Sequence, residues 1–316
     1  MLHLRIIAPV DRTEAVVALL EGTVGTTHLA VFPGAARTPP GDVVMCDVAR
    51  EAADDLLAEL RASGLPEDGC VAVDEVELSL SDRAEQAKVD APGEGVDAVL
   101  WESLTEETHE ESQLSITYLA FLTVATMLAA CGVMLDSAIL LVGAMVVGPE
   151  FGPLAGVCTS VVRRLPRLAF SSLTALVVGF LFAMAATGVF SVVLDGLGLF
   201  SEEDFTAPHP VSDFVWHPDA MSLVVAMLAG VAGILSLTSA KSGALLGVAI
   251  SVTTVPAAAF AALALGYGEL ADGGRAMLQL GVNLVGILLA GTLTLLAQKA
   301  FWARKRAQRP ASDPVS

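Results

Sequence analysis

The chain has 316 residues, a formal net charge of -18 and a mean hydropathy of +0.67. Residues 1–114 hold 24 acidic and 7 basic side chains, whereas residues 115–316 hold 11 and 10. Because the acidic excess lies almost wholly in the first third, composition argues against a nucleic-acid or anionic-lipid surface there. The chain is long enough for a soluble domain and an apolar membrane domain.

Residues 1–82 show the pattern of a small α+β domain. We expect strands at 2–8, 27–32, 42–48 and 70–80, a helix at 14–21 capped by Asp11, and a second helix at 50–62. Pro33-Gly34 is interpreted as a loop. The resulting order βαββαβ is that of a ferredoxin-like domain, which either binds a small ligand or assembles subunits.

Residues 83–114 predict a connection between two domains. Pro92, Gly93 and Gly95 indicate a linker, after which Val96, Val99, Leu100 and Leu104 recur at helical spacing. We expect an amphipathic helix near the membrane entrance. The acidic run 106–111 surrounds His109, and a solvated helix face is favoured there over a metal site.

Residues 115–300 predict an all-α membrane bundle. Six apolar stretches each approach the ~20 residues that a bilayer requires, at about 115–135, 138–162, 168–194, 221–240, 242–265 and 276–298. A basic tail, 301–316, follows the last of them.

Basic residues between the expected spans predict the orientation. Arg163, Arg164 and Arg167 lie between spans two and three, Lys241 lies between four and five, and five more basic residues follow span six. The positive-inside rule places this side in the cytoplasm. No secretory signal pattern is visible in the first ten residues. We therefore expect a multi-pass cell-membrane protein with both termini cytoplasmic.

The cysteines and histidines give no strong sign of a cofactor or metal. The four cysteines include no CxxC pair, so reduced core thiols are expected. His209 and His217 lie in an acidic loop expected outside the cell, but their spacing is a weak metal signal. We expect neither a cofactor nor a metal.

Span two contains a helix-breaking sequence, Gly148-Pro149-Glu150-Phe151-Gly152-Pro153. A helix interruption inside a bilayer is tolerated only where protein or a water-filled cavity pairs with its exposed backbone N–H and C=O groups. An ionisable residue at that depth indicates a functional site. Glu150 therefore needs a partner: hydroxyl groups, Gln279 or Asn283, the start of its own half-helix, or a transported cation or proton. A carboxylate that merely anchors the break is the alternative.

Span five repeats this feature in the second half of the bundle. Ser251, Thr253, Thr254 and Pro256 lie close to its centre. If the six spans form two halves of three, the middle spans of the two halves run in opposite directions. This is the arrangement of 3+3 inverted-repeat transporters with broken helices. The alternative is that Gly152-x-x-x-Gly156 and Gly243-x-x-x-Gly247 are close-packing faces, because glycine and proline are common in membrane helices. The candidate ion or transport site comprises Pro149, Glu150, Gly152, Pro153, Ser251, Thr253, Thr254, Pro256 and Asn283.

Several of these segments together resemble a known family. They are Asp136-Ser137, Val142 to Pro149, Gly152 to Leu154, Ala229 to Gly233, Gly247 to Pro256 and Asn283 to Gly286. Over about residues 115–296 they resemble the uncharacterised hydrophobic domain family, domain of unknown function 389. The chain departs from the expected pattern at Glu150-Phe151, where two apolar residues are commoner, and after Pro256, where a second proline is frequent. The resemblance implies a prokaryotic integral membrane protein and no particular activity.

Two functions fit these observations. The first is a transporter or channel for an ion or small solute, with a cytoplasmic domain that regulates or assembles it. The alternative is a non-transporting sensor or scaffold whose soluble domain binds a small metabolite. An enzyme is not expected, because HExxH, GxSxG and a close pair of membrane carboxylates are missing from the sequence. The expected partners are the lipid bilayer, a small-molecule or ion ligand and further copies of the chain, and no nucleic acid.

Overall fold

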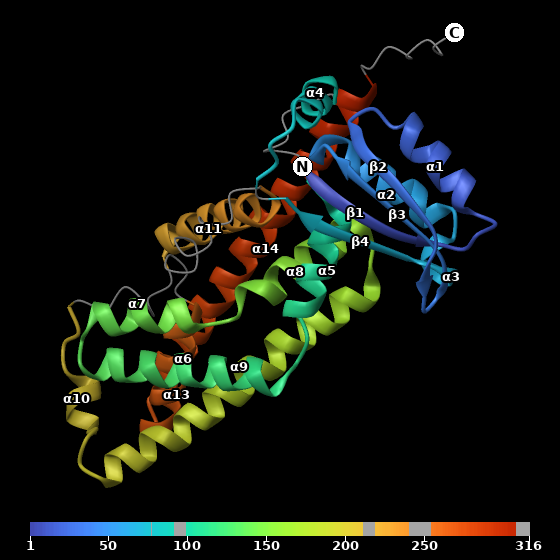
Figure 1. Ribbon diagram of the computed structural model, residues 1–316. Coiled ribbons are helices and arrows are strands. Elements are labelled where there is room, and N and C mark those ends of the chain that lie inside the picture. The colour runs from blue at the N-terminus through green and yellow to red at the C-terminus, as the bar shows by residue number, and fades with distance from the viewer. Residues whose placement is uncertain (77, 92–98, 211–218, 240–253, 308–316) are drawn as a thin grey trace. The chain divides into compact units, whose positions relative to one another are not determined.

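The computed structural model describes residues 1–76, 78–91, 99–210, 219–239 and 254–307. The chain divides into two compact units, the first made mainly of Met1–Leu104 and the second beginning at Thr105. The first unit is a sheet covered by helices, and the second is all-helical (Figure 1). An α+β domain followed by a helical membrane domain is therefore confirmed.

The first unit contains a four-stranded antiparallel sheet. Its strands lie in the order β2 (Thr26–Arg37), β3 (Pro40–Val48), β1 (Leu2–Ala8) and β4 (Cys70–Glu75). Helix α1 (Thr13–Gly22) follows β1, and α2 (Arg50–Ala62) with the short α3 (Leu65–Asp68) follows β3. The predicted chain order, strand-helix-strand-strand-helix-strand, is confirmed apart from the additional α3.

Side-chain alternation in the strands places both long helices on one face of the sheet. Along β1, Leu2, Leu4 and Ile6 are buried, as expected where one face of a strand meets a core. They share a core with Leu20 of α1 and Leu56 of α2. The opposite face of the sheet is thereby left for the polar residues of the same strands.

Three local predictions in this unit were wrong. Pro33-Gly34 is not a loop but lies inside β2, where a register shift between Phe32 and Ala36 absorbs the irregularity and Gly34 adopts φ 65°. The cap of α1 is Arg12 rather than Asp11, because the backbone first turns through an Arg12 N–H bond to the Pro9 carbonyl. Strand β4 ends at Glu75 rather than near residue 80.

Two helices follow the sheet before the apolar region. Helix α4 (Asp82–Asp90) is capped by Ser81, which accepts a hydrogen bond from the Ala84 N–H. Helix α5 (Trp101–Glu111) starts just after Leu100, whose side chain joins the core of the sheet. A helix is therefore present over 101–111, but of the four residues at helical spacing it contains only Leu104: Val99 and Leu100 precede it, and Val96 lies outside the described residues.

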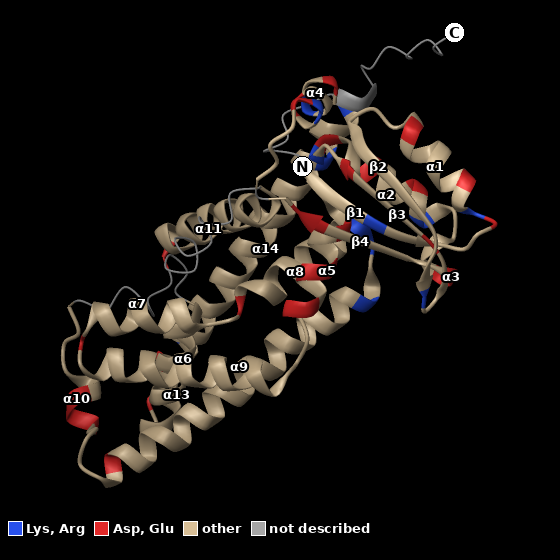
Figure 2. Cartoon of the chain, viewed as in Figure 1, with Lys and Arg blue, Asp and Glu red and all other residues tan. Residues whose placement is uncertain are grey.

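The second unit consists of helices of very different lengths. They are α6 (Ile116–Met134), α7 (Ala138–Val147), α8 (Phe151–Arg163), α9 (Pro166–Gly196), α10 (Glu202–Thr206), α11 (Ala220–Thr238), α13 (Thr254–Tyr267) and α14 (Leu270–Ala307). Four of them, α6, α9, α11 and α14, are long and apolar enough to cross a membrane. The pair α7 and α8 makes a fifth span if counted together. The colouring in Figure 2 marks many charged residues on the first unit and few along these helices.

The prediction of six spans is thus reduced to four or five for the described residues. The difference lies in the expected span 242–265, the first half of which falls outside them. Its described part, α13, has 14 residues, and every residue from Thr254 to Ala264 is buried. A helix that is apolar all round belongs in the centre of a bundle, and α13 packs against α6, α9 and α14.

The loop expected at 195–220 contains an unpredicted helix. Phe205 of α10 is buried with its ring 5.1 Å from that of Phe260 and 5.3 Å from that of Tyr267. This aromatic contact attaches the loop to the end of α13. The acidic residues Glu202 and Asp204 therefore lie at the same end of the bundle as Tyr267.

Candidate functional site

The predicted interruption of span two is present. Helix α7 ends at Val147, α8 begins at Phe151, and the two axes differ by 51°. Gly148 is extended, with φ -67° and ψ 127°. Pro149 has no N–H to continue the helical hydrogen bonds. Glu150 is the residue at the N-cap of α8.

Glu150 is buried, with 4% of its surface exposed, and in the described part of the chain one of its two carboxyl oxygens has a partner. The Thr254 hydroxyl donates to Oε1 over 2.7 Å. Oε2 has no hydrogen-bond partner among the described residues, and it lies so close to Gly148 that a Cβ there would collide with it. The start of α8 favours negative charge at this place. Glu150 therefore has an acceptor oxygen free for a donor or a cation.

The other predicted site residues separate into three groups. Gly152 and Pro153 are buried in the first turn of α8, and Pro256 is buried in the first turn of α13. Asn283 is buried in α14, where its Oδ1 accepts a 3.5 Å hydrogen bond from Gln279 Nε2. Ser251 and Thr253 lie outside the described residues.

A second interruption, between α5 and α6, lies beside the first. Glu111 packs against Gly152, where a Cβ would meet its side chain. One turn further along α8, Gly156 packs against Ser112, whose hydroxyl accepts a 2.8 Å hydrogen bond from Ser172. At the far end of α8, Arg163 donates to the Thr105 hydroxyl. Residues 105–111 therefore run antiparallel to α8.

The close packing that we considered as an alternative explanation for Gly152 and Gly156 is thus real, and their partner is α5. We did not predict this neighbour, because the acidic run 106–111 has the pattern of a solvated helix. The same glycine spacing is the only signal in the sequence that indicates a close neighbour. Glu111 and Tyr118 are consequently two site residues absent from the prediction.

A pocket of about 430 Å³ lies between the two interruptions. Its polar wall comes from the end of α5 and the start of α6: Glu110, Glu111, Gln113, Ser115 and Thr117. Its apolar wall comprises Tyr118, Phe121, Pro149, Phe151 and Leu237, and Gly148 and Gly152 complete it. Gly148 connects the pocket with Glu150: it lines the pocket, and it also lies next to Oε2 of Glu150. The pocket thus reaches the backbone of Gly148 and Pro149, the two residues that precede Glu150.

The pocket lies near the middle of the longest apolar helix of the bundle's first half. Tyr118 is 5% exposed and packs against Gly179, close to the centre of α9. Its hydroxyl is buried and has no hydrogen-bond partner among the described residues. A buried polar group without a partner is uncommon in native proteins and calls for an explanation. The hydroxyl lies against Gly179 of α9, where a Cβ would be 3.1 Å from it.

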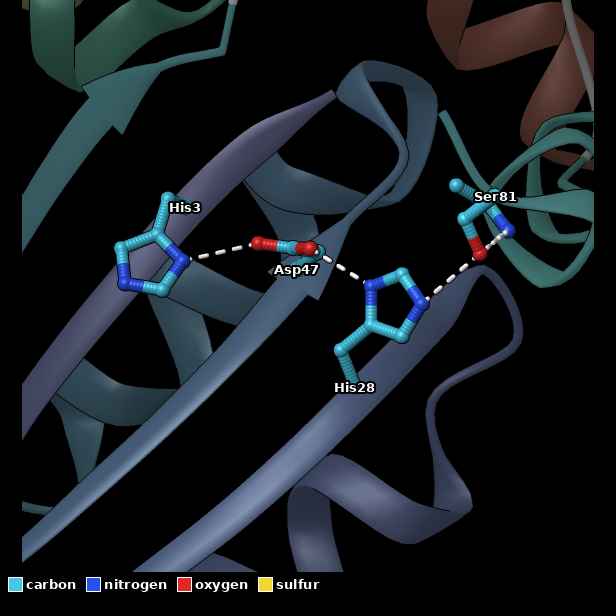
Figure 3. A network of polar contacts seen from close by, with 5 residues as sticks. His3, His28, Asp47 and Ser81 are labelled. Atoms are coloured by element: carbon cyan, nitrogen blue, oxygen red, sulfur yellow. Dashed lines mark hydrogen bonds and ion pairs between the residues drawn. The ribbon is translucent and has the colours of Figure 1, made fainter. Parts of the chain in front are cut away.

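The first unit carries a separate polar row on the face of the sheet opposite its helices (Figure 3). Asp47 on β3 lies in the middle, with Oδ1 2.8 Å from His3 Nδ1 and Oδ2 2.7 Å from His28 Nδ1. His28 Nε2 lies 2.9 Å from the Ser81 hydroxyl. Three strands and the residue that caps α4 are joined in this way.

The two middle members of the row, His28 and Asp47, have an unusual backbone conformation and a shifted pKa respectively. His28 adopts φ 53°, a left-handed conformation that costs energy for a non-glycine residue. Burial acts to raise the pKa of Asp47, but hydrogen bonds and positive charge from His28 and His3 outweigh it, so that pKa lies below its usual value. No group of three metal-ligating side chains exists among the residues that the structure describes.

Residues 145–289 match the family model described as Domain of unknown function (DUF389). The chain is also 24% identical over 216 residues to the uncharacterized protein MJ0678 of Methanocaldococcus jannaschii, an alignment that covers 66% of this chain and 63% of that protein. The chain therefore spans less than two thirds of the curated relative that it matches. No solved structure matches it. The expected resemblance is confirmed over a shorter range than 115–296: the chain carries a DUF389 domain at residues 145–289.

Proposed function

We propose that this integral membrane protein is a transporter or channel for an ion or small solute. The observation that carries the proposal is Oε2 of Glu150, which is buried in a helix break, has no partner among the described residues and lies against Gly148, a residue that also lines a pocket. A charge buried at mid-membrane costs about 2.5 to 3.5 kcal/mol on insertion scales. A passing cation or proton that neutralises Glu150 is the function that best accounts for this cost.

The course of the helices supports an inverted repeat of three and three spans. The pair α7 and α8 runs from the α10 end of the bundle towards Arg163, with its break in between. Helix α13 begins beside Glu150 and runs the opposite way, towards Phe205. In transporters built from inverted repeats, the middle helices of the two repeats run in opposite directions and are interrupted where they meet, and the binding site lies between them.

The charges at the two ends of the bundle support the proposed orientation. Lys299 Nζ donates to the Val162 carbonyl over 3.1 Å, which brings the basic end of α14 to the basic residues that follow α8. The acidic residues of α10 lie at the opposite end. The positive-inside rule then places the Lys299 end in the cytoplasm. The chain enters the second unit at this end, since Thr105 contacts Arg163, so a cytoplasmic first unit fits as well.

The proposal gives the first unit a regulatory or assembly role. Strand order β2-β3-β1-β4 with two helices on one face is the ferredoxin-like arrangement, a fold that hosts many ligand-binding and subunit-pairing domains. We extend the proposal to a homo-oligomer in the cell membrane. No residue is assigned a catalytic role.

The alternative function is a sensor or scaffold without transport. This alternative accounts for the polar row on the sheet as well as transport does. It gives no function to Oε2 of Glu150 or to the neighbouring pocket. Transport uses both of these features. We therefore favour transport.

Flux through the purified full chain in proteoliposomes tests the proposal. Uptake of labelled Na⁺, K⁺ and small organic cations, and internal pH, are measured for the wild type, Glu150→Gln and Glu150→Asp. We expect flux of at least one of these species in the wild type and a loss of tenfold or more in Glu150→Gln. Flux of none of them, with the protein folded and inserted, would contradict the proposal.

A further inference from the structure

We infer that the transported solute is a small organic cation, which binds in the pocket between the two helix breaks before it reaches Glu150. The inference rests on the proposed function and names its substrate class. Three properties of the pocket carry it: its size, its charge and its aromatic wall.

The volume of the pocket fits a small molecule better than a single metal ion. At about 430 Å³ it falls within the roughly 300 to 1,000 Å³ that is usual for small-molecule sites. The same volume would hold on the order of ten water molecules. A single alkali-metal ion would occupy little of it and would lack the close ring of oxygen ligands that such ions require.

The charged groups of the pocket select a cation. Glu110 and Glu111 line it, and none of the lining residues that the structure describes is basic. Gly148, which lines the pocket, also lies next to Oε2 of Glu150, an oxygen without a partner among the described residues. An anionic solute would meet carboxylates at the wall and again at the break, whereas a cation is attracted at both places.

The aromatic residues of the pocket select an organic cation over an inorganic one. Tyr118, Phe121 and Phe151 line the wall that continues from the carboxylates. Phe121 is half exposed there, whereas ring atoms of Phe151 pack against Gly233 and those of Tyr118 against Gly179. Ring faces attract ammonium groups, and quaternary ammonium ions are recognised by such rings in other proteins. Strongly hydrated inorganic cations gain less from an apolar wall, because they must give up water to touch it.

Binding to the full chain in lipid nanodiscs tests the inference, with calorimetric titration of tetramethylammonium and choline against Na⁺ and K⁺ at equal ionic strength. Glu111→Gln removes a wall charge and is compared with Glu106→Gln, a carboxylate on α5 that does not line the pocket. Phe121→Leu removes a ring but keeps an apolar side chain, and Phe121→Tyr keeps the ring.

We expect the organic cations to bind more tightly than Na⁺ or K⁺. Glu111→Gln and Phe121→Leu should each weaken binding about three- to tenfold, while Glu106→Gln and Phe121→Tyr should stay within twofold of the wild type. Equal binding of organic and inorganic cations, or equal binding by Glu111→Gln and the wild type, would overturn the inference.

The two proposals fail in different ways. If Na⁺, K⁺ or proton flux depends on Glu150 and organic cations do not bind, the substrate class is wrong and transport stands. If organic cations bind with the expected variant pattern but no flux of any kind is found, the pocket is a binding site and the proposed transport is wrong.

Discussion

The Thr254 hydroxyl donates a 2.7 Å hydrogen bond to Glu150 Oε1, although the two residues lie 104 positions apart in the chain. Both are buried. Glu150 stands at the start of α8, and Thr254 is the first described residue of α13. This bond joins the middle member of one half of the bundle to that of the other, and it fixes which carboxyl oxygen stays free.

Replacement of Thr254 tests the structural value of this bond. Thr254→Val keeps the shape of the side chain but removes the donor, so Oε1 of the buried Glu150 loses the hydrogen bond from Thr254. We expect the free energy of unfolding to fall by about 1 to 3 kcal/mol. Thr254→Ser keeps the hydroxyl and should lose much less. Denaturation of the two variants in the same detergent measures the difference, and equal stability would contradict the role given to the bond.

Position 148 requires glycine for a second reason besides the helix break. A Cβ at this position would collide with Glu150 Oε2 and with Val255. Gly148→Ala should therefore displace the carboxylate and reduce flux by tenfold or more. Gly143→Ala, five residues earlier in α7, meets open space and is the matched control. Equal flux in the two variants would show that Gly148 does not hold the carboxylate in place.

The pH dependence of cation binding should reflect Glu111. Its pKa is raised, first because burial disfavours the charged form and second because Glu107 repels it. The ionised form binds the cation, so binding is complete above this pKa and is lost as pH falls through it. The loss should therefore begin at higher pH than for an ordinary glutamate of pKa about 4.3.

Titration of tetramethylammonium between pH 8 and pH 4 measures this loss. Glu107 and Glu110 also belong to this acidic end of α5, so some pH dependence should remain in Glu111→Gln, but its onset should move to lower pH. An unchanged profile in Glu111→Gln would assign the titration to another group.

The polar row of the first unit predicts an acid-sensitive contribution to stability. The folded pKa of Asp47 is lowered, so its contribution is present above the unfolded pKa of about 3.9 and is lost as pH falls through the folded value. Asp47→Asn should lower the free energy of unfolding by about 1 to 3 kcal/mol at pH 7. The variant should also lose less stability than the wild type on acidification below about pH 4. Unfolding of the first unit, followed at several pH values, checks both expectations, and parallel curves would contradict them.

Local sequence was sufficient for the features that local chemistry determines. Gly148-Pro149 cannot continue a helix, and the break occurs at that dipeptide. Arg50–Ala62 begins and ends as its apolar spacing predicts. A hydroxyl partner for Glu150 was expected, and Thr254 supplies it.

Other features depend on tertiary contacts that a pattern does not contain. The end of α5 is acidic, yet it packs along α8 because Gly152 and Gly156 leave room for Glu111 and Ser112. The partner of Asp47 on β2, His28, is brought into place by an irregularity in strand pairing between Thr27 and Ala30. Neither relationship follows from spacing along a single segment.

Carbodiimide labelling of Glu150 is the most direct test of the claim that a cation passes through the pocket to this carboxylate. A hydrophobic carbodiimide is applied to the full chain in lipid, and modification of Glu150 is quantified by mass spectrometry with and without tetramethylammonium. We predict labelling of Glu150 that falls several-fold when the cation is present in the wild type, but not in Glu111→Gln. Labelling that the cation leaves unchanged in the wild type would contradict the account.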